Sequence, residues 1–282
     1  MELALVLTML AAVPEPFRTL EPGLELAELD SPVKSVVGDS RLTVVRVDPQ
    51  QRKLRLLSRV LEKLPDNPDA AEWARLYELP AVVNAGMYQM DFRSTVGYSQ
   101  VDGRVFNGAV HAGKNFQAYL AFDPREKGLA PVRILDPLCD DVKAELKRYG
   151  TALQSIRMVD CKGKNHWEQR KRKWSAALVG LDGKGRVLFI HARSPWAPTE
   201  FIDLLLGMKA LDLRQAVYME GGPEASLVVG AGGTSLTRIG SYESGFNEND
   251  DNHRLWALPN VLGVVKRQST VDSLQSTANA PR

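Results

Sequence analysis

The sequence predicts an α+β fold with many strands, about three helices and one parallel crossover. Short β-branched and apolar runs recur between turns that contain Gly, Asn or Asp, which is typical of strands joined by tight connections. An apolar, helix-like segment at 199–210 lies between two strand-like runs, and this order indicates a right-handed crossover between parallel strands. No Pro- or Gly-rich linker divides the chain, so we expect one domain from about 32 to 267.

The two ends of the chain differ in composition from this domain. Residues 1–13 are apolar apart from Glu2 and Thr8, but this run is too short to span a bilayer and lacks the basic start of a secretory signal. We therefore expect residues 1–31 to be a signal-like start and a lead-in segment, and the protein to be exported to the periplasm or secreted, with a cytoplasmic location as the alternative. Residues 268–282 are rich in Ser, Thr, Ala and Gln and are predicted to be a disordered tail.

Composition excludes several classes of protein. The 36 basic and 34 acidic residues give a net charge of +2, which argues against nucleic-acid binding through a broad basic field. No apolar run is long enough for a membrane helix, so an integral membrane protein is not expected. Cys139 and Cys161 show no metal-binding spacing and the histidines are scattered, which argues against zinc. A disulfide and two free thiols both remain open.

The first half of the chain is expected to hold mainly strands. Gly38–Ser40 is interpreted as the turn of a hairpin, and Asn67 as the cap of a helix that ends near Tyr77. The expected strands are Val33–Val37, Leu42–Val47, Lys53–Ser58, a short run beginning at Ala81, Val96–Val101, Arg104–Phe106 and Phe116–Phe122.

The second half combines helices and strands. A helix over Leu138–Tyr149 is expected to bury Leu138, Val142 and Leu146 and to end at Gly150. The helix Thr199–Ala210 is apolar nearly all round and is expected to be buried. Residues 160–173 and 240–253 are polar loops. The expected strands are Leu153–Val159, Trp174–Leu181 and Arg186–Ala192 as a hairpin, Ala216–Met219 and Leu258–Val265.

Two strand ends carry the clearest signals of a site. A short apolar strand stops at Glu220 and is followed by Gly221 and Gly222, so a ligand can approach the backbone and meet N–H groups that bind anions. Another strand runs into Asn84 and Gly86, which again suggests a pocket lined by backbone. The simpler interpretation of both is an exposed turn.

Two polar segments are weaker candidates for ligand binding. Lys114 and Asn115 lie just before a strand, where a cation and an amide suit a phosphate or a sugar, although most such pairs are only solvated. The acidic residues of the 240–253 loop lack the spacing of a known calcium loop. A divalent cation such as calcium therefore stays an open alternative to a solvated loop, and no metal ligand is assigned.

Four motifs follow one another along the chain. They are Asn84–Tyr88 (NAGMY), the strand–turn–strand over Ser175–His191, Ser194 before a helix, and Glu220-Gly-Gly with Ser226. Taken together in this order, they resemble the phosphodiester glycosidase family. The chain departs from the family pattern in four places: Ala85 replaces a common glycine, Glu220 a commoner Asp, the strand lacks its usual arginine, and only Gln154 remains of a Gln-Ala-Gly-Pro-type turn. The resemblance implies a strongly bent, mixed β-sheet wrapped around buried helices.

The resemblance also implies an activity, the hydrolysis of a sugar-1-phosphodiester at its sugar–phosphate linkage. Glu220 is expected to act as the base or the nucleophile, with Asn84 and Ser194 as further catalytic residues and either Glu224 or Asp91 as the partner carboxylate. Arg172 or Lys173 would stand in for the missing arginine. The expected substrate-binding residues are Gly86, Tyr88, Lys114, Asn115, Gln154, Arg157, Arg172, Lys173, Gly221, Gly222, Glu224 and Ser226.

Two other functions compete with this one. A protein that binds an envelope glycan or an anionic polymer without cutting it would tolerate the Glu-for-Asp change and the missing arginine. A structural envelope protein with no ligand is the third alternative. Turnover of a sugar phosphodiester separates the first hypothesis from both.

Overall fold

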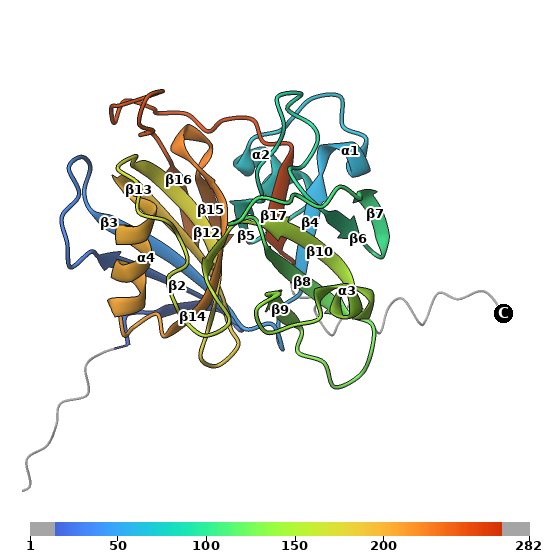
Figure 1. The fold of residues 1–282 in the computed structure, drawn as a ribbon. Coiled ribbons are helices and arrows are strands. Elements are labelled where there is room, and N and C mark those ends of the chain that lie inside the picture. Colours follow the sequence, from blue (N-terminus) through green and yellow to red (C-terminus); the bar gives the residue numbers. More distant parts are fainter. Residues whose placement is uncertain (1–14, 267–282) are drawn as a thin grey trace, which may run out of the picture.

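The computed structural model describes residues 15–266, and these residues form three β-sheets (Figure 1). The largest sheet has seven strands in the order β1-β2-β3-β13-β12-β14-β11. Its strands are β1 (Arg18–Glu21), β2 (Leu24–Asp30), β3 (Arg41–Val47), β11 (Arg157–Val159), β12 (Trp174–Asp182), β13 (Val187–Trp196) and β14 (Leu213–Gly221).

Two five-stranded sheets complete the β-structure, with the orders β7-β6-β10-β8-β9 and β16-β15-β5-β17-β4. The strands of the first are β6 (Ser99–Val101), β7 (Arg104–Asn107), β8 (Ala118–Pro124), β9 (Val132–Leu135) and β10 (Tyr149–Ser155). Those of the second are β4 (Leu54–Ser58), β5 (Ala81–Asn84), β15 (Ser226–Ala231), β16 (Thr234–Ile239) and β17 (Asn260–Val264).

Helices are few and short. The α-helices are α1 (Arg59–Glu62), α2 (Ala70–Leu76), α3 (Val142–Glu145) and α4 (Pro198–Gly207), and two 3₁₀ turns are η1 (Leu146–Arg148) and η2 (Gly222–Glu224). The combination of sheets with a few helices agrees with the predicted α+β class. Among residues 15–266, no helix has the length and apolar character needed to cross a membrane.

The largest apolar core lies among the strands, with the helices outside it. Side chains from all three sheets, such as Leu26, Leu153 and Val83, meet in one cluster, and no helix contributes to it. A second cluster lies between the seven-stranded sheet and α4, which covers one face of that sheet in Figure 1. The implied sheet wrapped around buried helices is therefore wrong, because the centre is filled by strand side chains with Ala85 and Ala225 and no helix contributes to it.

The sheets are antiparallel throughout, which corrects the expected mixed sheet. Every pair of adjacent strands described runs antiparallel. β13 and β14, the strands on either side of α4, do run in the same direction, but each pairs with β12, which lies between them. The hairpin predicted over β12 and β13 is present.

Both longer helices depart from the prediction in the details. α4 is amphipathic rather than buried all round, since Phe201 and Ile202 are buried while Glu200 and Asp203 are exposed. α2 is capped by Asp69, whose carboxylate accepts hydrogen bonds from the N–H groups of the first turn in a capping box with Glu72. The predicted cap, Asn67, lies before it. A Glu at the third helical position favours Asp69.

The helix expected over 138–149 is reduced to α3 and η1. Leu138 is 46% exposed, so it is not part of a buried face. The backbone carbonyl of Asp136 accepts the N–H groups of both Cys139 and Asp140, which turns the chain before α3 starts. Cys139 is bonded to Cys161 in a disulfide. Tyr149 and Gly150 belong to β10, which pairs with β8.

The start of the domain also differs from the prediction. Residues 33–40 form no strand; there, the N–H of Ser40 donates to the Ser194 hydroxyl. The lead-in segment instead supplies β1 and β2, and β2 pairs along its whole length with β3. The signal-like residues 1–14 and the predicted tail lie outside the described residues.

Candidate active site

Three carboxyl groups come together where β14 ends. Glu220 is the last side chain of that strand, Glu224 follows in η2, and Glu243 lies in the loop after β16. The register of β14 on β12 shifts between the pairs Tyr218–Leu178 and Glu220–Ala177, which leaves one extra residue on β14. Such a bulge re-aims the side chains beside it and is common next to active sites.

Glu220 is held in its protonated form by its surroundings. Burial above all, opposed by a hydrogen bond from Gly221 and assisted by the neighbouring carboxylates of Glu224 and Glu243, raises the pKa of Glu220 to about 8. That bond joins the Gly221 N–H to Glu220 Oε1 at 3.1 Å. At neutral pH this side chain therefore carries a proton that it can donate.

A chain of hydrogen bonds connects Glu224 to the early motif. The Tyr88 hydroxyl donates to Glu224 Oε1 at 3.2 Å. The Ser226 hydroxyl donates to the Glu224 carbonyl, and the Ser226 N–H donates to Asn84 Oδ1 at 3.0 Å. The structure therefore brings together four residues that the sequence placed in two separate motifs. Burial raises the pKa of Glu224, and the Tyr88 bond works against this rise.

Asn84 has a free donor in this arrangement. Its Nδ2 is buried and has no hydrogen-bond partner within the described part of the chain. A buried N–H group without a partner costs free energy, so it is a strong candidate to contact a ligand oxygen. Gly86, two residues on, has a φ of +68° and packs against Leu153, so its conformation and its surroundings both favour glycine.

Glu243 is a site residue that the sequence did not reveal. A Cβ on Gly222 would lie 2.6 Å from Glu243 Oε2 and 3.5 Å from Glu224 Oε2, so both carboxylates converge on this glycine. Burial raises the pKa of Glu243, and the charge of Arg172 lowers it. The sequence showed Glu243 only as one acid in a polar loop. Its position depends on an antiparallel β-bridge between its backbone and that of Trp174, and no local sequence pattern indicates this pairing.

Aromatic rings form one wall beside the carboxyl groups. The Tyr218 ring lies 5.6 Å from Trp167 and 6.3 Å from Trp174, between ring centres. A Cβ on Gly221 would collide with the Tyr218 hydroxyl and with Trp174. Only glycine therefore fits at position 221. Aromatic surfaces next to polar groups are typical of ligand sites. None of these three rings was singled out from the sequence.

Two predicted binding residues have their polar groups engaged elsewhere. Gln154 Oε1 accepts the N–H groups of Tyr98 and His111, and its Nε2 donates to the carbonyls of His111 and Phe116. Arg157 forms a buried ion pair with Asp136 at 2.6 Å. Both side chains thus hold loops of the fold in place, which the sequence could not distinguish from ligand contacts.

The remaining predicted residues divide between the site and other parts of the fold. Arg172 acts electrostatically on Glu243, whereas the Lys173 ammonium lies 3.9 Å from Glu200 on α4. Buried Ser194 accepts the Ser40 N–H. Lys114 is exposed and paired with Glu168.

Two further predicted residues, Asn115 and Asp91, form hydrogen bonds away from the three carboxyl groups. The Asn115 carbonyl accepts the Arg157 N–H. The Asp91 carboxylate accepts three hydrogen bonds from Arg93 and Ser94 in its own turn. Glu224, and not Asp91, is therefore the carboxylate beside Glu220. Among residues 15–266, no three His, Cys, Asp or Glu side chains are arranged to hold a metal ion.

Comparisons with known proteins bear on this site. Residues 77–265, well over half of the chain, match the family model described as phosphodiester glycosidase. The sequence matches no curated protein. The fold is similar to the catalytic domain of zebrafish N-acetylglucosamine-1-phosphodiester alpha-N-acetylglucosaminidase, auto-inhibited by its pro-peptide, with a TM-score of 0.61 at 14% identity over 89% of this chain and 86% of that one.

A second solved structure shares the fold. A hypothetical protein from Synechocystis aligns with a TM-score of 0.59 at 11% identity, over 87% of this chain and 62% of that chain. At these identities the likeness concerns the fold alone. The family match, which contains Asn84, Glu220, Glu224 and Glu243, is independent of it. The chain belongs to the phosphodiester glycosidase family.

Proposed function

We propose that this protein hydrolyses a sugar-1-phosphodiester at the bond between the anomeric carbon and the phosphate oxygen. The observation that carries the proposal is the convergence of Glu220, Glu224 and Glu243 on the Gly221–Gly222 turn, inside the region that matches the family. Water adds to the anomeric carbon and the carbon–oxygen bond breaks. The products are a free sugar and a phosphate monoester.

In this proposal Glu220 is the proton donor. Its pKa of about 8 leaves it protonated at neutral pH, so it can protonate the phosphate oxygen as that oxygen leaves the sugar. The family resemblance of the sequence implied the role of base or nucleophile for Glu220 instead. Desolvation supports the acid role, because the group gives up its proton only at a pH above the neutral range. A neutral Glu220 also reduces repulsion of the anionic substrate.

Glu224 is the general base that takes the proton from the attacking water. The Tyr88 hydroxyl bonded to Glu224 Oε1 favours its charged form and fixes its orientation. Two carboxyl groups whose environments separate their pKa values provide an acid and a base from the same residue type. Glu243, which Arg172 partly compensates, adds negative charge that stabilises the positive charge developing on the sugar.

Donors for the phosphate come from the edges of the same turn. The unpartnered Nδ2 of Asn84 offers a buried N–H pair to a phosphate oxygen, whereas Gly222, with a φ of +64°, faces the carboxylates of Glu243 and Glu224. Arg172 supplies a positive charge on the same side as Glu243. The rings of Trp174 and Tyr218 would pack against the sugar. Which sugar and which alcohol the substrate carries is left to the assay.

The test is turnover of a panel of sugar-1-phosphodiesters, nucleotide sugars included, by the purified protein. We expect release of free sugar and phosphate monoester, and a loss of roughly 10²–10⁴-fold in kcat/KM in Glu220→Gln. Glu78→Gln, which changes an exposed glutamate in the turn after α2, is the matched control and should retain full activity. Turnover that survives Glu220→Gln would move the acid to another residue. Absence of turnover in folded wild-type protein would favour a glycan-binding protein.

We also propose that the protein works outside the cytoplasm. The supporting observation is the Cys139–Cys161 disulfide, since such bonds persist mainly in oxidising compartments. Mass spectrometry of protein isolated under alkylating, non-reducing conditions should find both cysteines blocked from alkylation. Alkylation of both in freshly isolated protein would contradict the proposal.

A further inference from the structure

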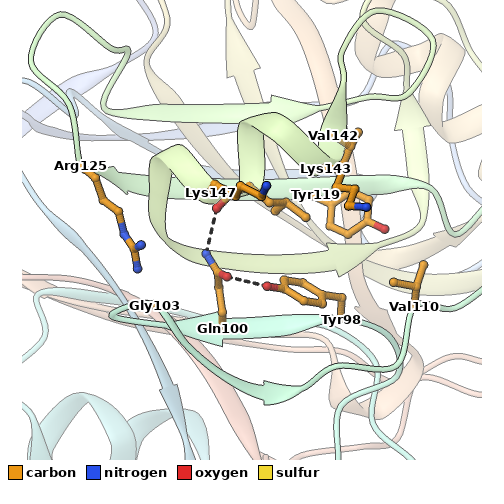
Figure 2. Close-up of a pocket in the computed structure, with 10 residues that line it drawn as sticks. Tyr98, Gln100, Gly103, Val110, Tyr119, Arg125, Val142, Lys143 and Lys147 are labelled. Atoms are coloured by element: carbon orange, nitrogen blue, oxygen red, sulfur yellow. Dashed lines mark hydrogen bonds between the residues drawn. The ribbon is translucent and has the colours of Figure 1, made fainter.

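A cavity outside the carboxylate site lies between β6 and the α3–η1 segment. It has a volume of about 650 Å³ and walls that are mostly apolar. Figure 2 shows the side chains that line it. That size is within the range of pockets that hold small organic molecules. The residues around it are Tyr98, Gln100, Gly103, Val110, Tyr119, Arg125, Val142, Lys143, Leu146 and Lys147.

The floor of the cavity is built rigidly. The Tyr98 hydroxyl donates to Gln100 Oε1 at 2.5 Å (Figure 2). Gln100 Nε2 donates to the carbonyls of Leu146 and Tyr149. Gln100 is only 5% exposed, so these bonds fix it under the opening. Tyr98 and Tyr119 meet edge to face at 6.3 Å between ring centres. The cavity is therefore a formed site and not a gap between mobile side chains.

The rim is positively charged. Arg125, Lys143 and Lys147 line the cavity, and no Asp or Glu does so within the described part of the chain. None of these three cations forms an ion pair there. The nearby acids Glu126 and Glu145 are bonded to other arginines.

Arg125 is placed over the cavity by a glycine. A Cβ on Gly103 would overlap the Arg125 guanidinium, and Gly103 has a φ of +76°. Figure 2 shows Arg125 on one side of the opening, with Lys143 and Lys147 on the helical segment above it. Burial raises the pKa of Tyr119, so its hydroxyl stays a donor at neutral pH. All the groups available to a ligand's polar end thus favour negative charge.

We propose that this cavity binds an organic anion with an apolar body, such as a carboxylate or a phosphate monoester on an alkyl or aromatic group. The apolar part would occupy the space between Tyr98, Val142 and Leu146, and the anionic group would lie between Arg125 and the two lysines. Such a ligand satisfies both features of the cavity. A neutral apolar molecule leaves the cations uncompensated, and a small inorganic anion leaves the apolar walls exposed to water.

The first experiment titrates the full-length protein with the fluorescent aromatic anion 8-anilinonaphthalene-1-sulfonate. We expect saturable binding to one site. The double variant Lys143→Gln/Lys147→Gln should weaken it roughly tenfold, because two charge-assisted contacts are lost. Lys184→Gln, which changes an exposed lysine in the β12–β13 turn, should bind like wild type. Equal affinity in wild type and the double variant, or no saturable binding, would overturn the proposal.

A second variant separates binding from folding defects. Val110 is 62% exposed, so Val110→Asp should fold normally while placing a negative charge at the opening. It should also weaken binding of the probe, with an unchanged unfolding midpoint. Unchanged affinity in this variant would count against the assigned cavity.

Competition then tests the chemistry and the source of the anion. Dodecanoate should displace the probe, whereas dodecyl maltoside, which has the same chain and a neutral head, should not. Displacement by both would overturn the anionic requirement. Binding to phosphatidylglycerol vesicles, lost in the double variant, would assign the anion to a lipid headgroup. Binding of dodecanoate without vesicle binding would assign it to a free metabolite.

Discussion

Buried charges are paired with opposite charges in one region of this molecule and lie beside like charges in another. Around Asp136, 0% exposed, and Arg157, 5% exposed, the opposite charges lie 2.6 Å apart, and Asp136 also accepts the Leu138 and Cys161 N–H groups. Around Glu220, three carboxyl groups lie at one turn, and the charge of Arg172 acts on Glu243. The first arrangement stabilises the fold, whereas in the second the carboxyl groups repel one another and reduce stability.

This difference separates structure from function among residues that look alike in the sequence. Both Arg157 and Glu220 are ionisable residues at the ends of apolar strands. A compensated buried pair needs no ligand, while uncompensated carboxyl groups with raised pKa values are what an acid–base site requires. Substitutions in the two regions should therefore have different effects on stability and on catalysis.

Breaking the buried pair should have the largest effect on stability. Arg157→Met leaves the Asp136 carboxylate buried without its cation, so we expect a loss of about 3–5 kcal/mol in the free energy of unfolding. Urea denaturation measures it. In the double variant Arg157→Met/Asp136→Asn much of this loss should be recovered, because no uncompensated charge remains. A single variant as stable as wild type would show that the pair contributes nothing.

Removing one carboxylate from the site should affect catalysis and spare stability. Glu224→Gln eliminates the proposed base, so kcat/KM on a sugar phosphodiester should fall by roughly 10²–10³-fold. Its unfolding midpoint should stay equal to or rise above that of wild type, because one of three crowded carboxyl groups is gone. Exposed Glu248→Gln, in the acidic loop that carries Glu243, is the control. A marked loss of stability in Glu224→Gln would place this residue with the structural charges.

The sequence predicted where the site lies better than it predicted which residues form it. Glu220, Gly221 and Gly222 at a strand end are visible locally because a carboxylate followed by two glycines interrupts an apolar run. Glu243 is not, because it reaches the site only when its loop pairs with the start of β12. Gln154 was assigned to the substrate through the family motif alone, and its four hydrogen bonds to loop backbone could not be foreseen.

The strands and helices were likewise predicted only in part. Strands with a clear apolar run, such as β12 to β14, were found, because periodicity depends on neighbours in the chain. β2 was missed since its Glu and Asp residues resemble a solvated segment, and its strand form depends on pairing with β3. The helix expected at 138–149 failed for the same reason. There, hydrogen bonds to Asp136 and pairing of β10 override the helical pattern.

The pH dependence of stability should distinguish the two regions more finely. The pKa of Glu220 rises from 4.5 to about 8 on folding, so the native state holds its proton more tightly than the unfolded chain. Its contribution to stability is therefore greatest below pH 4.5, falls as the pH rises towards 8, and stays constant above that. Relative to Glu220→Gln, wild type should lose on the order of 2 kcal/mol between pH 5 and pH 9, allowing for water at the partly open site. Parallel curves would mean that Glu220 is not desolvated.

The smallest effect should come from the hydrogen bond that makes Glu224 differ from Glu220. Tyr88→Phe removes the hydroxyl that donates to Glu224 Oε1 at 3.2 Å, which favours the charged carboxylate. The pKa of Glu224 should rise, so the increase of kcat/KM on its acid limb should move to higher pH and the rate at neutral pH should fall about tenfold or less. Phe92→Leu, which alters the ring packed 5.6 Å from Tyr88, controls for packing and should leave that limb in place. A uniform fall in rate with an unmoved acid limb would assign Tyr88 to substrate binding. The difference in pKa between Glu220 and Glu224 would then have to come from burial alone.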